Sequence, residues 1–166
     1  QGPYAFLLES VEGGERLARY SFIGTDPFLV VELDDGVARL RSTGVRETLA
    51  ASALASFGGA DYYGHPAQEQ RVTFEDPLRF LANLLGRYRT VHLPDMPRFL
   101  GGAVGYLGYE TIRYCEPRVP AAPQDTLGLP EAVFLFVDSM LVFDHLERTI
   151  AVVSHVHVED GVPLER

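Results

Sequence analysis

The 166-residue chain has the length of one domain or of a compact part of a larger one. Its 14 Lys and Arg residues are outnumbered by 23 Asp and Glu residues, and the net charge of -9 argues against a nucleic-acid partner. Apolar residues make up 46% of the sequence, enough for a folded core. No apolar run approaches the ~18 residues of a membrane helix, so we expect no membrane association.

The chain has a single cysteine, Cys115, which cannot form an internal disulfide and favours a reducing cytoplasm. The sequence begins at Gln1 without an initiating Met and enters a strand-like segment within three residues. It stops in a charged stretch ending at Arg166. We therefore expect a part excised from a longer protein, although a short natural protein would give the same sequence.

Four short apolar segments in the first quarter of the chain have the length and bulk of β-strands. They are residues 4–8, 20–24, 28–33 and 37–41. The sequence Asp34-Asp35-Gly36 joins the last two and predicts a hairpin turn, because glycine accepts the positive φ that such turns require.

Residues 43–70 have weak periodicity and predict a loop, with a possible short helix over 48–57. The next segment predicts a helix. Asp76 is a plausible N-cap before Pro77, and apolar side chains then recur at helical spacing up to Tyr88.

The second half of the chain predicts further β-structure. Residues 98–109 contain four glycines and favour a strand that a neighbouring backbone or ligand approaches closely. After a proline-rich loop over 117–130, residues 132–143 and 149–158 predict a closing hairpin around the turn 144–148. Strands joined by hairpins with few helices indicate an antiparallel α+β fold rather than a doubly wound parallel sheet.

Three groups of residues could carry chemistry but have simpler interpretations. The glycine spacing from Gly102 matches neither a dinucleotide fingerprint nor a P-loop. His155 and His157 share a strand face but lack further ligands at metal-binding spacing, so a solvated face is the better interpretation. Cys115 has no nearby histidine to activate it. We predict no catalytic residue and no metal site in this chain.

The sequence Leu7-Leu8-Glu9-Ser10 is more informative, because an apolar strand here ends in an acid and a hydroxyl. In one interpretation Glu9 pairs with Arg16 or Arg19, and Ser10 caps the following turn. In the other, the carboxylate meets a ligand ammonium group while the hydroxyl completes the polar end of an apolar pocket. Such a pocket would suit an amino acid.

Two blocks resemble the N-terminal region of anthranilate synthase component I. The first runs from Phe6 through Leu7-Leu8-Glu9-Ser10 and Arg19-Tyr20-Ser21 to Gly24. The second is the glycine-tyrosine segment over 101–114. Their order and separation also fit, so the resemblance covers nearly the whole of residues 1–166.

The resemblance implies a fold in which antiparallel sheets pack orthogonally with flanking helices. It also implies an enzyme that makes anthranilate and pyruvate from chorismate, using Mg²⁺ and ammonia from a glutamine amidotransferase partner (component II). Tryptophan would inhibit this step of tryptophan biosynthesis by feedback. Chorismate and Mg²⁺ would bind in a C-terminal domain absent from this chain, so residues 1–166 alone should be a regulatory region without activity.

The resemblance places the tryptophan site at Leu8, Glu9 and Ser10, with Arg19, Tyr20 and Ser21 nearby. It also suggests that the glycine block lies where close sheet packing couples the tryptophan site to the distant active site. Two alternatives remain open. One is the large subunit of para-aminobenzoate (aminodeoxychorismate) synthase, and the other is a non-catalytic module that binds an amino acid.

Overall fold

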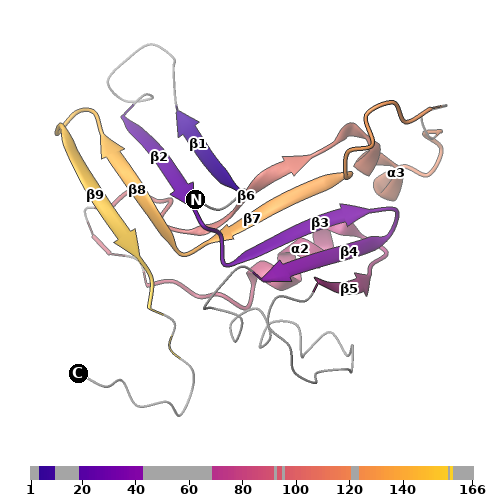
Figure 1. Ribbon diagram of the computed structural model, residues 1–166, viewed down its shortest axis with the longest axis horizontal. Coiled ribbons are helices and arrows are strands. Elements are labelled where there is room, and N and C mark those ends of the chain that lie inside the picture. Colours follow the sequence, from indigo (N-terminus) through magenta and orange to yellow (C-terminus); the bar gives the residue numbers. More distant parts are fainter. Residues whose placement is uncertain are drawn as a thin grey trace.

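The computed structural model describes residues 4–9, 19–42, 69–91, 93–94, 96–120, 124–156 and 158. These residues form two antiparallel sheets that meet at an angle (Figure 1). The four-stranded sheet has the order β1 (Ala5–Glu9), β2 (Tyr20–Thr25), β8 (Ser139–Asp144), β9 (Thr149–Ser154). The five-stranded sheet has the order β5 (Glu69–Thr73), β4 (Val37–Ser42), β3 (Leu29–Asp34), β7 (Ala132–Val137), β6 (Gly102–Leu107). The α+β class with antiparallel sheets is therefore confirmed.

The chain passes between the two sheets at two neighbouring places. Strand β2 leads into β3, and β7 leads into β8. The Phe28 N–H donates to the Phe136 carbonyl over 2.9 Å, and the His155 N–H donates to the Asp138 carbonyl over 2.8 Å. Residues 26–28 and Asp138 thus form the joint between the sheets.

The predicted single strand over 132–143 is wrong in one respect. The run divides at Asp138, with β7 in the five-stranded sheet and only β8 forming the hairpin with β9. Asp138 is 3% exposed, so the strand changes sheets at a buried polar residue. An uninterrupted apolar run looks the same whether it stays in one sheet or crosses between two.

The hairpin between β3 and β4 is confirmed. Asp35 and Gly36 have φ angles of 45° and 73°, which is the left-handed geometry of a two-residue turn. The helix after Asp76 is confirmed as α2 (Pro77–Leu85), where the Asp76 carboxylate accepts hydrogen bonds from the Leu78 and Arg79 N–H groups. The possible helix over 48–57 lies outside the described residues.

Three elements were not predicted from the sequence. Strand β5 begins at Glu69, within a segment that predicted a loop, and pairs with β4. The short 3₁₀ helix η1 (Tyr109–Thr111) and α3 (Ile112–Cys115) follow the glycine-rich strand β6. Elements this short carry too few residues for a recognisable period.

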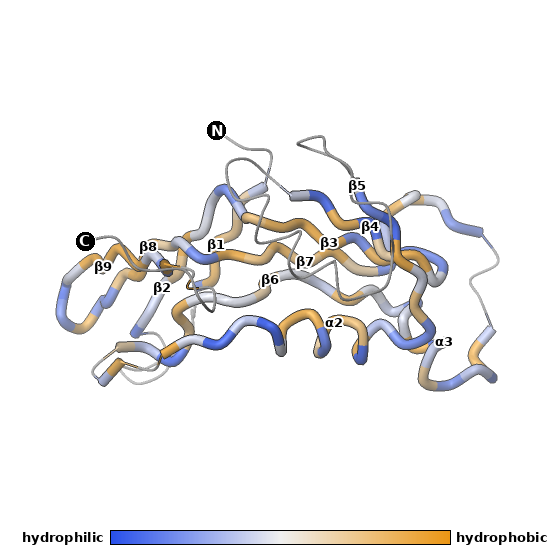
Figure 2. The backbone as a smooth tube through the Cα atoms, turned by 90° about the horizontal axis from the view of Figure 1, so that it is seen from below, coloured by the Kyte–Doolittle hydropathy of each residue, from blue (hydrophilic) through white to orange (hydrophobic). Residues whose placement is uncertain are grey.

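The core has two parts, one under each sheet. Helix α2 covers one face of the five-stranded sheet and buries Phe80, Leu81 and Leu84 against it (Figure 2). Segment 96–100 covers the four-stranded sheet, where Leu100 packs with Met140 and Val142. No helix formed by the described residues is long and apolar enough to cross a membrane.

Candidate functional site

Strand pairing gathers polar side chains at one end of the four-stranded sheet. Glu9 lies opposite Ser21 across the β1–β2 pair. Tyr20 lies opposite Asp144 across the β2–β8 pair, and His145 follows at the start of the β8–β9 turn. We call the set Glu9, Arg19, Ser21, Asp144 and His145 the polar end of the sheet. The sequence predicted the first three of these as site residues, and the structure adds the last two.

Arg19 is held by Asp144 through a bidentate ion pair. The Arg19 Nε donates to both carboxylate oxygens over 3.0 and 2.9 Å, and Nη2 donates over 2.6 Å. Asp144 also accepts from the N–H groups of Leu146 and Glu147, which shapes the turn. The hydrogen bond from Arg19 lowers the pKa of Asp144 from 3.8 to about 2. This pair fixes β2 to the end of β8.

A second link joins the same two segments. The Ser21 Oγ and the His145 Nε2 are 2.7 Å apart in a hydrogen bond, and the His145 N–H donates to the Arg19 carbonyl over 2.8 Å. Ser21 is 6% exposed, so its hydroxyl is covered rather than presented to solvent. Ser21 therefore contributes through its position opposite Glu9 and its bond to His145.

The predicted site residues divide between the two faces of the sheet. Side chains alternate along a strand, so Leu8 and Glu9 point to opposite faces. Leu8 shares its face with its cross-strand partner Phe22, which belongs to the core cluster. Glu9 shares the other face with Ser21. Ser10 lies outside the described residues.

Tyr20 points to the face of Leu8 and contributes to the core. It belongs with Phe22 to the cluster under the four-stranded sheet, and the two ring centroids are 6.1 Å apart. The Arg19 guanidinium lies 5.0 Å from the Tyr20 ring centroid. One interpretation of Glu9 was an ion pair with Arg16 or Arg19. The Arg19 guanidinium is already paired with Asp144, so Glu9 would have to compete for it. Arg16 lies outside the described residues.

The face that carries Glu9 continues into an exposed apolar surface. Leu7 is 55% exposed, Ile150 is 60% exposed and Val152 is 78% exposed. Strand register places them on the same face as Ser21 and Phe143. We call Leu7, Leu141, Ile150 and Val152 the apolar face. The described part of this sheet face thus places exposed apolar side chains beside the Glu9 carboxylate.

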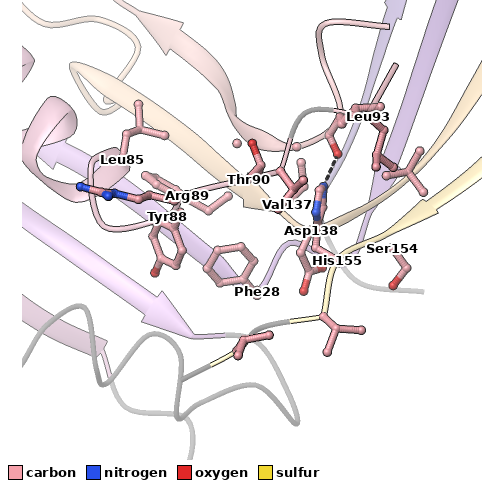
Figure 3. Close-up of a pocket in the computed structure, with 18 of the residues that line it drawn as sticks. Phe28, Leu85, Tyr88, Arg89, Thr90, Leu93, Val137, Asp138, Ser154 and His155 are labelled. Atoms are coloured by element: carbon pink, nitrogen blue, oxygen red, sulfur yellow. Dashed lines mark hydrogen bonds between the residues drawn. The ribbon is translucent and has the colours of Figure 1, made fainter. Parts of the chain in front are cut away.

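A second candidate site is a cavity of about 670 Å³ at the joint between the sheets (Figure 3). Phe28, Tyr88 and Val137 form part of its apolar wall, and Asp138 and His155 supply polar groups. Burial raises the pKa of Tyr88 to about 12. The lining of this cavity does not include the residues that the sequence predicted for a ligand site and that the structure describes, which are Leu8, Glu9, Arg19, Tyr20 and Ser21.

His155 has a structural contact that the sequence did not suggest. Its Nε2 forms a hydrogen bond of 2.7 Å with the Leu100 carbonyl, drawn as the dashed line in Figure 3. The ring is partly buried rather than on a solvated strand face. His157 lies outside the described residues. Across the described ranges, no three His, Cys, Asp or Glu side chains are grouped to hold a metal ion.

The glycine block starts at the joint and runs away from it as edge strand β6. A Cβ at Gly105 would lie 1.9 Å from the Val133 carbonyl oxygen and 2.8 Å from the Phe134 Cα. The predicted close approach is confirmed, and the approaching backbone is the neighbouring strand β7. Gly101, at the other end of the block, lies against His155.

No protein-family model matches the chain. Curated relatives do match it. Anthranilate synthase component 1 of Acetivibrio thermocellus is 40% identical over 157 residues, which are 95% of this chain and 27% of the relative. The probable anthranilate synthase component 1 of Schizosaccharomyces pombe is 35% identical over 98% of this chain and 25% of its own length.

This chain is homologous to a segment of anthranilate synthase component 1. It spans about a quarter of the length of the curated relatives that it matches. A crystal structure of anthranilate synthase component I from Streptococcus pneumoniae TIGR4 matches with a TM-score of 0.56 and 25% identity. That match covers 93% of this chain and 27% of the solved one. The fold of an anthranilate synthase segment thus extends over almost the whole chain, as the sequence blocks indicated.

Proposed function

We propose that this chain is the N-terminal regulatory region of an anthranilate synthase component 1. The full-length protein would convert chorismate and ammonia into anthranilate and pyruvate in the cytoplasm, for tryptophan biosynthesis. The observation that carries the proposal is the 40% identity to such an enzyme across 95% of the chain. The name component 1 also supports a component 2 partner, to which we assign the glutamine amidotransferase activity.

In this proposal tryptophan binds at the polar end of the four-stranded sheet and inhibits the enzyme. Glu9 is exposed and would receive the ammonium group, with Ser10 beside it and Ser21 directly across the strand pair. The indole would lie on apolar side chains of β1. Because side chains alternate, Leu7 shares the face of Glu9, whereas Leu8 would contribute through its backbone or from the opposite face.

The catalytic chemistry is assigned to the part of the homologous enzymes that this chain does not cover. Chorismate and Mg²⁺ would bind there, and Mg²⁺ would supply positive charge near the substrate carboxylates. The polar end described above offers a bidentate ion pair, a hydroxyl–imidazole pair and one exposed carboxylate. That set suits the recognition of an amino acid better than the binding of a divalent cation. We therefore expect residues 1–166 to be inactive when isolated.

The test is the product formed by the full-length protein. Purified enzyme supplied with chorismate, Mg²⁺ and ammonium should produce the fluorescence of anthranilate, and added tryptophan should suppress it. A Ser10→Phe variant should keep anthranilate formation and lose the suppression, because a bulky ring replaces a small group directly after Glu9 in the sequence. Ser42→Phe is a matched control on β4 of the other sheet.

Other products would redirect the proposal. Formation of aminodeoxychorismate instead of anthranilate would move the protein to para-aminobenzoate synthesis and leave Leu8, Glu9 and Ser10 as structural residues. Binding of tryptophan without any turnover of chorismate would identify a non-catalytic module. Either result would contradict the function proposed here.

A further inference from the structure

The polar end of the sheet contains a side chain that has no assigned role, His145. Its ring is bonded to Ser21, and its backbone N–H is bonded to the Arg19 carbonyl. Ser21 belongs to β2, the strand that pairs with β1, and Arg19 directly precedes that strand. They lie 124 and 126 positions before His145 in the sequence. A residue of the β8–β9 turn is therefore attached at two points to the strand beside Glu9.

We propose that His145 is a positioning residue of the tryptophan site, acting through Ser21 on the strand that carries Glu9. This inference rests on the proposed function of the site. Ser21 and Glu9 are directly opposite each other in the β1–β2 ladder, so a shift of Ser21 moves the Glu9 backbone. Glu9 is the last residue of β1, and among the described residues Glu9–Ser21 is the last pair of this ladder.

The geometry favours positioning over contact with the ligand. The Ser21 hydroxyl is covered, and its hydrogen bond to the His145 Nε2 leaves the imidazole engaged on that side. The neighbouring charges face each other rather than the site, because Arg19 is paired with Asp144 and lies 4.0 Å from Glu147. Within the described part of the polar end, Glu9 is the exposed carboxylate that a ligand can reach, and the Ser21–His145 hydrogen bond supports the strand opposite it.

The support should also raise the affinity of the site for its occupant. A fixed carboxylate at the end of an apolar strand accepts an ammonium group at a set distance from the apolar face. If the Ser21–His145 hydrogen bond is lost, the Glu9 carboxylate samples several positions. The position that binds the ligand is then populated for a smaller fraction of the time. Affinity for an aromatic amino acid should fall while the site keeps its charge.

The experiment is a double-mutant cycle on tryptophan inhibition of the full-length enzyme. His145→Ala and Ser21→Ala should each raise the tryptophan inhibition constant about fivefold, the loss expected of one side-chain hydrogen bond. The double variant should be no worse than either single one, because both changes remove the same bond. The inhibition constant does not depend on the amount of active enzyme, so partial loss of folded protein does not imitate the effect.

Two further variants separate positioning from general stability. His145→Gln keeps a side-chain amide within reach of the Ser21 hydroxyl and should restore most of the affinity for tryptophan. Ser139→Ala removes the 3.2 Å contact with Ser154 at the other end of the same sheet and should leave the inhibition constant unchanged.

The outcomes distinguish this inference from the function on which it rests. A wild-type enzyme that makes anthranilate but ignores tryptophan would overturn both the site and the role of His145. A wild-type enzyme that tryptophan inhibits, with His145→Ala equally sensitive, would overturn only the role of His145. Additive effects of the two alanine substitutions would also contradict it, because they would show that the residues act separately.

Discussion

The ion pair between Arg19 and Asp144 contains the shortest hydrogen bond among the described groups of the candidate site, 2.6 Å. The pKa of Asp144 is about 2 in the folded chain, below its ordinary value of 3.8. A carboxylate with a lowered folded-state pKa stabilises the fold above its ordinary pKa, and this stability is lost as the pH falls toward the folded-state value. The pair should therefore stabilise the sheet at neutral pH and stop doing so between about pH 4 and 2.

An Asp144→Asn variant tests whether the Arg19–Asp144 pair stabilises the fold at neutral pH and not at low pH. Its thermal unfolding midpoint should lie below that of the wild type at pH 7, and the difference should shrink as the pH falls from 4 to 2. Glu75→Gln removes an exposed carboxylate outside the sheets and serves as the control. A difference between wild type and Asp144→Asn that stays constant from pH 7 to 2 would contradict the assignment.

The candidate site was predicted only in part from individual residues. The local sequence alone indicated Glu9 and Ser10, because an acid and a hydroxyl follow an apolar strand. Asp144 and His145 could not be found that way, because they reach Arg19 and Ser21 through the β2–β8 pairing of segments more than 120 positions apart. In the sequence they are indistinguishable from ordinary polar turn residues.

At the scale of elements, edge strand β6 depends on the missing side chain of Gly105. A valine at this position would force its side chain into the β7 backbone, since even a Cβ would lie 1.9 Å from the Val133 carbonyl oxygen. Gly105→Val should reduce the free energy of unfolding by about 2–3 kcal/mol, a typical cost of overpacking. Urea unfolding of the variant measures this directly.

Leu107→Ala on the same strand is the control, because the Leu107 side chain is 42% exposed and its loss should cost little. An unchanged unfolding midpoint in Gly105→Val would contradict the close contact with β7.

The idea that β6 couples the tryptophan site to the catalytic domain has a separate test. Normal tryptophan sensitivity in full-length Gly105→Val would count against that coupling.

Elements were predictable where local chemistry decides the structure. Asp35-Gly36 specifies its own turn through positive φ angles, and Asp76-Pro77 specifies the start of α2 through a cap and a fixed φ. The division of 132–143 at Asp138 depends instead on which strands are available as neighbours. Local sequence does not contain that information, and the same is true of the short edge strand β5.

At the scale of the whole molecule, the two faces of the four-stranded sheet differ in character. One face is covered by segment 96–100 and holds the second core cluster. The other carries the apolar face, with Val152 78% exposed and Ile150 60% exposed, and ends at Glu9 and Ser21. An amino acid that met Glu9 with its ammonium group would lay its side chain along this second face.

Hydrogen exchange of the full-length protein would show whether tryptophan binds at the polar end of the four-stranded sheet, as we propose. Adding saturating tryptophan should slow the exchange of backbone amides at the end of β1, at the start of β2 and in the β8–β9 turn. Amides of segment 87–91, which line the cavity at the joint, should exchange at unchanged rates. Protection confined to that segment, or no protection anywhere in residues 1–166, would contradict tryptophan binding at this end of the sheet.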